Sequence, residues 1–225
     1  MLNEDDPQPD HGPDHDHGHG SGHHERIVGA QAWDERYASA DQIWSGRPNG
    51  ALVTEVAHLQ PGRALDVGCG EGADAVWLAG NGWEVTALDV STVALARAAV
   101  HAEQANARVT WVAAGLEEAP LAAQSFDLVT AQYPALLRTP GHDAERKLLA
   151  CVAPGGTLLV VHHADFDAAH ASDFDPEDYV NPGDVAAALD DGWQIEINEK
   201  RPRTITGGAG AGHSHDLILR ARRLG

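Results

Sequence analysis

Three glycines at alternate positions follow an acid in the stretch Asp66-Val67-Gly68-Cys69-Gly70-Glu71-Gly72. Glycine allows a positive φ and leaves no Cβ between the backbone and a ligand. An apolar run, residues 64–67, leads into the stretch, and residues 73–79 follow it with a helical pattern. The start of such a helix offers unpaired N–H groups and the positive end of its dipole. The order of strand, glycine turn and helix predicts a binding site for a nucleotide-like cofactor.

Two classes of cofactor are compatible with this loop. The pattern Gly68-x-Gly70-x-x-Ala73 satisfies the dinucleotide motif G-x-G-x-x-G/A, so an NAD(P)-dependent oxidoreductase is one alternative. A second predicted strand ends in Asp89 about 20 residues later, where a carboxylate can accept hydrogen bonds from ribose hydroxyls. Both classes share that acid, and it therefore supports the fold more than the choice of cofactor.

The form D-x-G-x-G-x-G, which starts at Asp66, resembles motif I of the class I S-adenosylmethionine-dependent methyltransferases. Phe126-Asp127-Leu128-Val129 is similar to motif IV of that family, and Pro154-Gly155-Gly156 before an apolar strand is similar to its later motifs. The three matches occur in the family's order, and the resemblance covers nearly the whole chain except the N-terminal tail. It implies transfer of a methyl group from S-adenosylmethionine to a small-molecule acceptor.

The resemblance also implies which residues bind S-adenosylmethionine. They come from motif I, the end of the second strand, the segment after the third strand, the end of the fourth strand and the N-terminal segment: Asp66, Gly68, Cys69, Gly70, Gly72, Asp89, Val90, Leu116, Glu117, Gln132 and Tyr37. One position departs from the family pattern. Gly115 stands where an acid often takes the adenine amine in that family, so we expect the backbone of Leu116 to serve and the side-chain contact either to be missing or to move to Glu117.

Candidate catalytic residues stand where the fourth and fifth predicted strands end, at Tyr133, His162 and His163. The carboxyl ends of parallel strands meet at one edge of a sheet, which is where ligands bind in such folds. Imidazole can accept a proton near neutral pH, and alternation along the strand lets only one of the two histidines point inward. An oxygen or nitrogen nucleophile can use such a base, whereas a thiolate needs none. Packing roles remain the alternative for all three residues.

Residues 1–25 form a separate region that is rich in His, Asp, Gly and Pro and almost free of apolar residues. Such a segment buries too little surface to offset its ordering entropy, so we expect it to be disordered. Neutral imidazole binds divalent transition metals, which makes His15, His17 and His19 candidate ligands and a metal-binding or sensor protein a non-enzymatic alternative. The irregular spacing of the histidines favours a solvated tail instead.

Residues 26–50 carry three aromatic residues, Trp33, Tyr37 and Trp44. Trp33 and Tyr37 are four apart, on one face of a predicted helix. The segment resembles the N-terminal lids of small-molecule methyltransferases similar to the tellurite-resistance and thiopurine types, although packing of a helix on the sheet would explain the same residues. Residues 51–225 are the predicted methyltransferase domain. We expect an α/β, doubly wound, Rossmann-like seven-stranded sheet closed by an antiparallel C-terminal hairpin.

The composition restricts the partners. The chain has 225 residues with 15 basic and 34 acidic ones, a formal net charge of −19, which disfavours nucleic acid and anionic membranes as partners. Its two cysteines, Cys69 and Cys151, form no disulfide framework. No apolar run is long enough to span a membrane, and the N-terminus lacks a signal pattern, so we expect a cytoplasmic protein. The sequence does not decide the oligomeric state.

Overall fold

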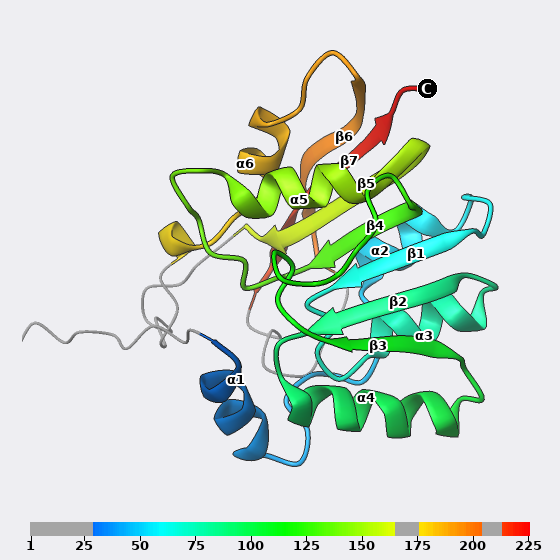
Figure 1. Ribbon diagram of the computed structural model, residues 1–225, viewed down its shortest axis with the longest axis vertical. Helices are drawn as coiled ribbons and strands as arrows, with labels where there is room; N and C mark the ends of the chain where they lie inside the picture. Colours follow the sequence, from blue (N-terminus) through cyan, green and yellow to red (C-terminus); the bar gives the residue numbers. More distant parts are fainter. Residues whose placement is uncertain (1–28, 165–175, 204–212) are drawn as a thin grey trace, which may run out of the picture.

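A computed structural model describes residues 29–164, 176–203 and 213–225 of the chain (Figure 1). Its seven strands form one sheet in the order β3-β2-β1-β4-β5-β7-β6. Neighbouring strands from β3 to β5 are parallel, whereas β7 is antiparallel to both β5 and β6. The strands are β1 Arg63–Val67, β2 Glu84–Asp89, β3 Val109–Ala113, β4 Phe126–Gln132, β5 Val152–His163, β6 Trp193–Pro202 and β7 His215–Arg223. This topology confirms the predicted α/β fold with its antiparallel C-terminal hairpin.

Helices cover both faces of the sheet (Figure 1). The helices are α1 Gly29–Ala38, α2 Gly50–Val56, α3 Ala73–Gly80, α4 Thr92–Gln104, α5 Asp143–Cys151 and α6 Pro182–Ala187, with a 3-10 turn at Pro176–Asp178. Apolar residues of α5 and α6 pack with one face of the central strands, and those of α2 and α3 pack with the other. Because helices bury the central strands on both faces, the sequences of these strands are nearly continuous apolar runs.

Two element boundaries differ from the sequence-based expectation. The strand expected from Thr157 begins at Val152, so Pro154-Gly155-Gly156 lies within β5 rather than before it. The ladder between β4 and β5 shifts register between Phe126 and Leu128, and Gly155 has a φ of +79°. A bulge of this kind accommodates proline and glycine in a strand. The apolar residues of segment 51–60 have a spacing that predicts a helix, but the helix found there, α2 Gly50–Val56, ends earlier.

The register of the sheet positions the functional edge. Asp66 of β1 is paired with Thr130 of β4 and Ala87 of β2, so their side chains share one face of the sheet. Gln132 lies two residues beyond Thr130 and therefore on the same face, the face that α2 and α3 cover. His163 at the end of β5 is paired with Asp216 at the start of β7.

Candidate functional site

The glycine loop that joins β1 to α3 needs glycine for its conformation. Gly68, Gly70 and Gly72 have φ values of +69°, +52° and +81°, in the left-handed region that other residues disfavour. The backbone N–H groups of Gly68 and Cys69 both donate to the carbonyl of Leu88, at 2.9 and 3.0 Å, which ties the loop to β2. The loop thus lies at the carboxyl edge of the sheet, where the sequence predicted a cofactor, with Gly68 exposed and Gly70 and Gly72 buried.

The three glycines have different surroundings. A methyl group built at Gly72 would lie 2.7 Å from Ala98 Cβ, so this glycine allows the loop to pack closely against α4. A methyl group at Gly68 would meet nothing closer than Pro134, at 3.8 Å. The close packing of the loop against α4 therefore explains Gly72, whereas the space beside Gly68 is open to a ligand.

Asp66 is a buried carboxylate, 1% exposed, directly before the loop. It accepts a hydrogen bond from the backbone of Ala75, but its Oδ2 has no hydrogen-bond partner among the described residues. The same is true of the Oε1 of Gln132, whose Nε2 donates to Thr130 Oγ1 at 2.8 Å. Buried polar atoms are nearly always paired, so two open acceptors on one face of the sheet fit a ligand that donates hydrogen bonds.

Negative charge accumulates at the same place. Burial and the neighbouring Asp74 and Asp89 raise the pKa of Asp66 well above its usual value. Burial also raises the pKa of Asp74 to about 6, although the backbone N–H and the Nδ2 of Asn49 both donate to its carboxylate at 2.7 Å. A cationic donor would relieve the repulsion between these carboxylates. The residues therefore fit the amino group that the resemblance predicts beside Asp66.

Asp89 ends β2 and is 8% exposed. Its Oδ2 accepts from the N–H of Gly70 and its Oδ1 accepts from the N–H of Ser91, both at 2.9 Å. Each carboxylate oxygen can accept more than one hydrogen bond. Asp89 thus holds the glycine loop in place, and its carboxylate can still accept the hydrogen bonds from ribose hydroxyls that the sequence predicts.

The segment after β3 contains an acid that the sequence analysis missed. Leu116 is buried, whereas Glu117 is exposed. A methyl group built at Gly115 would collide with Oε2 of Glu118, and Cγ1 of Val90 would lie 3.7 Å from it. Ala119 donates its N–H to the carbonyl of Gly115 at 3.0 Å, and this turn brings Glu118 back over the glycine. The carboxylate of Glu118, which is exposed as Glu117 is, therefore reaches the space beside Gly115. An i to i+4 turn that starts at Gly115 is the signal that could have indicated it.

Two aromatic residues of the N-terminal segment lie on the glycine loop. Trp44 Nε1 donates to the hydroxyl of Tyr37 at 2.9 Å. A methyl group at Gly70 would lie 2.9 Å from that hydroxyl and 3.2 Å from Trp44 Nε1. Tyr37, which is only 3% exposed, thus packs on the loop, a contact that a lid and simple packing of the segment would both produce.

A polar cluster fastens this segment to the loop. The carboxylate of Glu71 accepts from the N–H groups of Ile43 and Trp44 and from Arg97 Nη1 at 2.9 Å. Arg97 Nη2 also donates to the carbonyls of Tyr37 and Ala40, at 2.8 and 2.7 Å. We call Glu71 and Arg97 the latch. The latch connects the N-terminal segment, the glycine loop and α4.

Tyr133 stands at the end of β4 with a φ of +53°, an uncommon conformation for a non-glycine residue. Its N–H donates to the carbonyl of Val161 at 2.8 Å. Its ring stacks on His163 with 4.2 Å between centroids, and the Arg203 guanidinium lies 4.8 Å from the Tyr133 ring centroid. Backbone strain often marks functional sites, and the strained residue here faces the predicted acceptor side.

Of the two predicted histidines, only His163 joins this group. His163 continues the face of Leu159 and Val161, whereas His162 lies on the opposite face of β5. His163 also stacks on His213, with 3.7 Å between ring centroids. Burial, His213 and Arg203 lower the pKa of His163 to about 2, and burial lowers that of His162. These imidazoles are neutral at neutral pH, and an aromatic stack with so low a pKa favours a positioning role for His163 over proton transfer.

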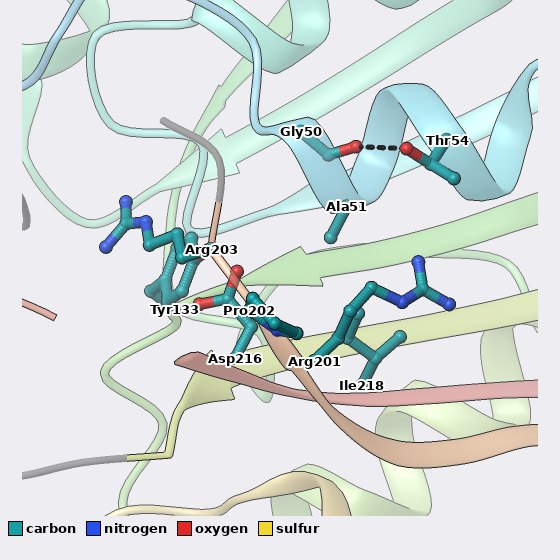
Figure 2. A pocket seen from close by; sticks show the side chains of 9 residues that line it. All are labelled: Gly50, Ala51, Thr54, Tyr133, Arg201, Pro202, Arg203, Asp216 and Ile218. Carbon is teal, nitrogen blue, oxygen red and sulfur yellow. Dashed lines mark hydrogen bonds between the residues drawn. The ribbon is translucent and has the colours of Figure 1, made fainter. Parts of the chain in front are cut away.

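A small hollow opens beside Tyr133, with a cavity volume of about 60 Å³ (Figure 2). Its wall includes Gly50 and Ala51 of α2, Arg203 after β6, and Asp216 and Ile218 of β7. Asp216 accepts a hydrogen bond from the hydroxyl of Tyr133. Neither Asp216 nor Arg203 was singled out from the sequence, because only the hairpin brings them back to the end of β4.

Two further expectations concern metals and membranes. The candidate ligands His15, His17 and His19 lie outside the described residues. Within residues 29–164, 176–203 and 213–225, no group of three or more His, Cys, Asp or Glu side chains is arranged to hold a metal ion. Over the same residues, no helix has the length and apolar character needed to cross a membrane.

Comparison with known proteins identifies the domain. Residues 64–156 match the family model described as a methyltransferase domain. The malonyl-[acyl-carrier protein] O-methyltransferase of Enterobacter lignolyticus is 36% identical over 108 residues, which are 48% of this chain and 41% of that protein. An uncharacterized methyltransferase of Mycobacterium bovis is 35% identical over 122 residues, 54% of this chain and 61% of that protein. The chain thus spans about half the length of the curated relatives it matches.

A solved structure extends the likeness beyond the matched segment. The N-methyltransferase NodS from Bradyrhizobium japonicum, in complex with S-adenosyl-L-homocysteine, is similar with a TM-score of 0.66 and 20% identity. The alignment covers 87% of this chain and 99% of that one. At this identity the likeness shows the fold, including the hairpin strands that the matched family segment leaves out.

Proposed function

We propose that the chain is a class I S-adenosylmethionine-dependent methyltransferase and that it transfers a methyl group to a small-molecule acceptor by in-line displacement. The match of residues 64–156 to a methyltransferase domain supports this proposal. The single observation that carries the proposal is the buried Oδ2 of Asp66, which lies beside a loop of three left-handed glycines and has no hydrogen-bond partner among the described residues. A carboxylate left open at this position fits an ammonium ligand. The pyrophosphate of a dinucleotide would be repelled by it.

When bound, S-adenosylmethionine supplies a methyl group on a positively charged sulfur. In the proposed arrangement Asp66 and Gln132 accept hydrogen bonds from its amino group, and Asp89 accepts from the ribose hydroxyls. The backbone of Leu116, the side chain of Val90 and the carboxylate of Glu118 form the adenine side. Gly68, Cys69 and Gly70 lie along the methionine part, and Tyr37 and Trp44 exclude water above it.

The acceptor side of the proposed site begins at Tyr133. Tyr133 directly precedes Pro134, which lies beside Gly68 of the glycine loop. The side chain of Tyr133 lines the hollow together with Asp216 and Arg203. Alignment of the nucleophile with the methyl group can supply on the order of 7–11 kcal/mol of the barrier. A rigid, partly strained Tyr133 suits that task. A small acceptor is supported by the dimensions of the hollow.

The proposal is tested by calorimetric titration with S-adenosylhomocysteine and, in parallel, with NADH, on the wild type and on Asp66→Asn. We expect the wild type to bind S-adenosylhomocysteine alone. The Asn variant should bind at least about tenfold more weakly, because a charge-assisted hydrogen bond of about 1.5–3 kcal/mol is lost. Its melting temperature should not fall, since the substitution removes a buried, unpaired charge.

Glu84→Gln is the matched control, because Glu84 is an exposed acid at the opposite end of β2. It should bind as the wild type does. Binding of NADH in place of S-adenosylhomocysteine would overturn the proposal in favour of an oxidoreductase. An Asp66→Asn variant that binds S-adenosylhomocysteine normally would remove the observation on which the proposal rests.

A further inference from the structure

The hollow beside Tyr133 contains a carboxylate that the proposed cofactor contacts do not use. Asp216 is 5% exposed, yet its Oδ1 has no hydrogen-bond partner among the described residues. Nδ1 of His163 is 3.9 Å from Oδ1, which is beyond hydrogen-bond distance. A buried carboxylate oxygen left without a donor costs free energy, so this position favours a ligand that brings one.

Figure 2 shows how Asp216 is presented. Its carboxylate lies between the Tyr133 ring and Pro202, at the end of the hollow nearest to Arg203. The Tyr133 hydroxyl donates to it, which fixes its orientation. Because Tyr133 directly precedes Pro134, which lies beside Gly68, the carboxylate is connected to the glycine loop through two consecutive residues.

The charged neighbours restrict which ligand fits. Arg201 also lines the hollow, but its guanidinium is paired with Glu55 and Glu199 at 2.7 and 2.8 Å. The Arg203 guanidinium lies over the Tyr133 ring, and His163 is neutral. An anionic ligand would meet the carboxylate of Asp216 at close range, whereas a neutral or cationic hydrogen-bond donor would pair with it.

We propose that this hollow is the acceptor subsite and that Asp216 binds the hydroxyl or amino group of the acceptor that receives the methyl group. This inference rests on the proposed function. When the acceptor oxygen or nitrogen forms its bond to the methyl carbon, the carbon–sulfur bond breaks and its electron pair stays on sulfur. The proton of the acceptor's O–H or N–H moves to Oδ1 of Asp216, which balances the charge. Acceptors that react as thiolates or carboxylates would gain nothing from Asp216.

The test uses four ring probes that differ in one group: phenol, aniline, anisole and benzoate. Their binding to the full-length protein is followed by NMR, through the side-chain carboxyl carbon of Asp216 and the aromatic signals of Tyr133. We expect phenol and aniline to bind. Anisole, which lacks the donor, and benzoate, which is anionic, should bind about tenfold more weakly. This selectivity is measured in the wild type and needs no variant.

Two variants refine the test. Asp216→Asn should remove most of the preference for phenol over anisole, because a charge-assisted hydrogen bond becomes a neutral one. Asp191→Asn, an exposed acid before β6, should keep the preference. A preference for benzoate, equal binding of phenol and anisole, or no binding of any probe would each overturn the inference.

Titration with S-adenosylhomocysteine on the same samples separates this inference from the proposed function. If the wild type binds S-adenosylhomocysteine but shows no donor preference, only the assignment of Asp216 fails. If it does not bind S-adenosylhomocysteine, the proposed function fails, and the probe data still report on the hollow itself.

Discussion

Asp66 and Asp74 are buried near each other behind the glycine loop, and both have a raised pKa. An ammonium ligand favours the ionised form of both carboxylates, so binding should release protons. We therefore expect the affinity for S-adenosylhomocysteine to rise with pH through about 6, the pKa of Asp74, because below it protons compete with the ligand.

Calorimetry at pH near 6 in two buffers of different ionisation enthalpy measures this release directly. The apparent binding enthalpy should differ between the buffers for the wild type and differ less for Asp66→Asn, which has one carboxyl group fewer to titrate. Equal enthalpies in the two buffers for the wild type would mean that the carboxylates are already ionised in the free protein.

The position of Glu118 over Gly115 leads to a second prediction at the residue scale. A carboxylate there can accept from the exocyclic amine of adenine. Glu118→Ala should weaken S-adenosylhomocysteine binding about five- to tenfold, or about 1–1.4 kcal/mol, because solvent weakens a hydrogen bond to an exposed carboxylate. Glu117→Ala, the neighbouring exposed acid, should have little effect.

S-inosylhomocysteine, in which oxygen replaces that amine, provides the matched ligand. The wild type should bind it more weakly than S-adenosylhomocysteine, and Glu118→Ala should bind both alike. If the Glu117 variant loses affinity instead, the residue expected from the sequence is the correct one.

At the scale of elements, the latch joins three segments that are far apart along the chain. The Arg97 side chain is 27% exposed and that of Glu71 10%, so solvent screens the pair only in part. Arg97→Ala should lower the free energy of unfolding by about 1–2 kcal/mol, because it also removes the hydrogen bonds to the carbonyls of Tyr37 and Ala40.

The latch prediction has a local readout as well. Amide hydrogen exchange over residues 29–49 should accelerate in Arg97→Ala while exchange in β1 and β4 stays slow, since the sheet does not depend on the latch. Arg108→Ala, an exposed arginine just after α4, is the control and should leave both unchanged. Uniform acceleration throughout the domain would show that Arg97 supports the whole fold and not the N-terminal segment alone.

The helix and strand signals in the sequence were reliable where one element could be recognised by itself. Ser91 is of a residue type that is favoured at the start of a helix, and its Oγ accepts from the N–H of Ala94 at 3.1 Å in the first turn of α4. Asn181 is of such a type as well, and it caps α6 through a capping box with Asp184. The start of β5 was misplaced because its first residues depend on the irregular pairing with β4, a contact between distant segments.

At the scale of the whole molecule, the net charge of −19 and the histidine-rich residues 1–25 remain to be connected with function. Deletion of residues 1–25 tests whether the tail matters to the proposed site. We expect the deletion to abolish most retention of Ni²⁺ or Zn²⁺, since neutral imidazoles are the preferred ligands, and to leave S-adenosylhomocysteine affinity within about twofold.

The full-length protein with His15, His17 and His19 changed to Ala is the matched control for the deletion. If those three histidines form a site, the triple variant should lose as much metal binding as the deletion does. Loss of S-adenosylhomocysteine binding on deletion would mean that the tail contributes to the cofactor site.

The sequence alone determined the fold and the edge of the sheet at which the proposed cofactor site lies. Motif I, Asp89 and the order of strands and helices are local patterns. The carboxyl ends of adjacent parallel strands must meet, so Asp66, Gln132 and Tyr133 could be assigned to one edge in advance.

Only the tertiary structure decided the rest. The structure shows that Asp66 and Gln132 each have a buried oxygen without a hydrogen-bond partner among the described residues, and that Glu118 turns back to Gly115. It also brings together four residues from segments up to 83 residues apart: Tyr133, His163, Arg203 and Asp216. A carboxylate in a sequence has the same formula whether it is paired or open. Burial and the positions of its neighbours decide which one it is, and therefore which carboxylates can receive a ligand.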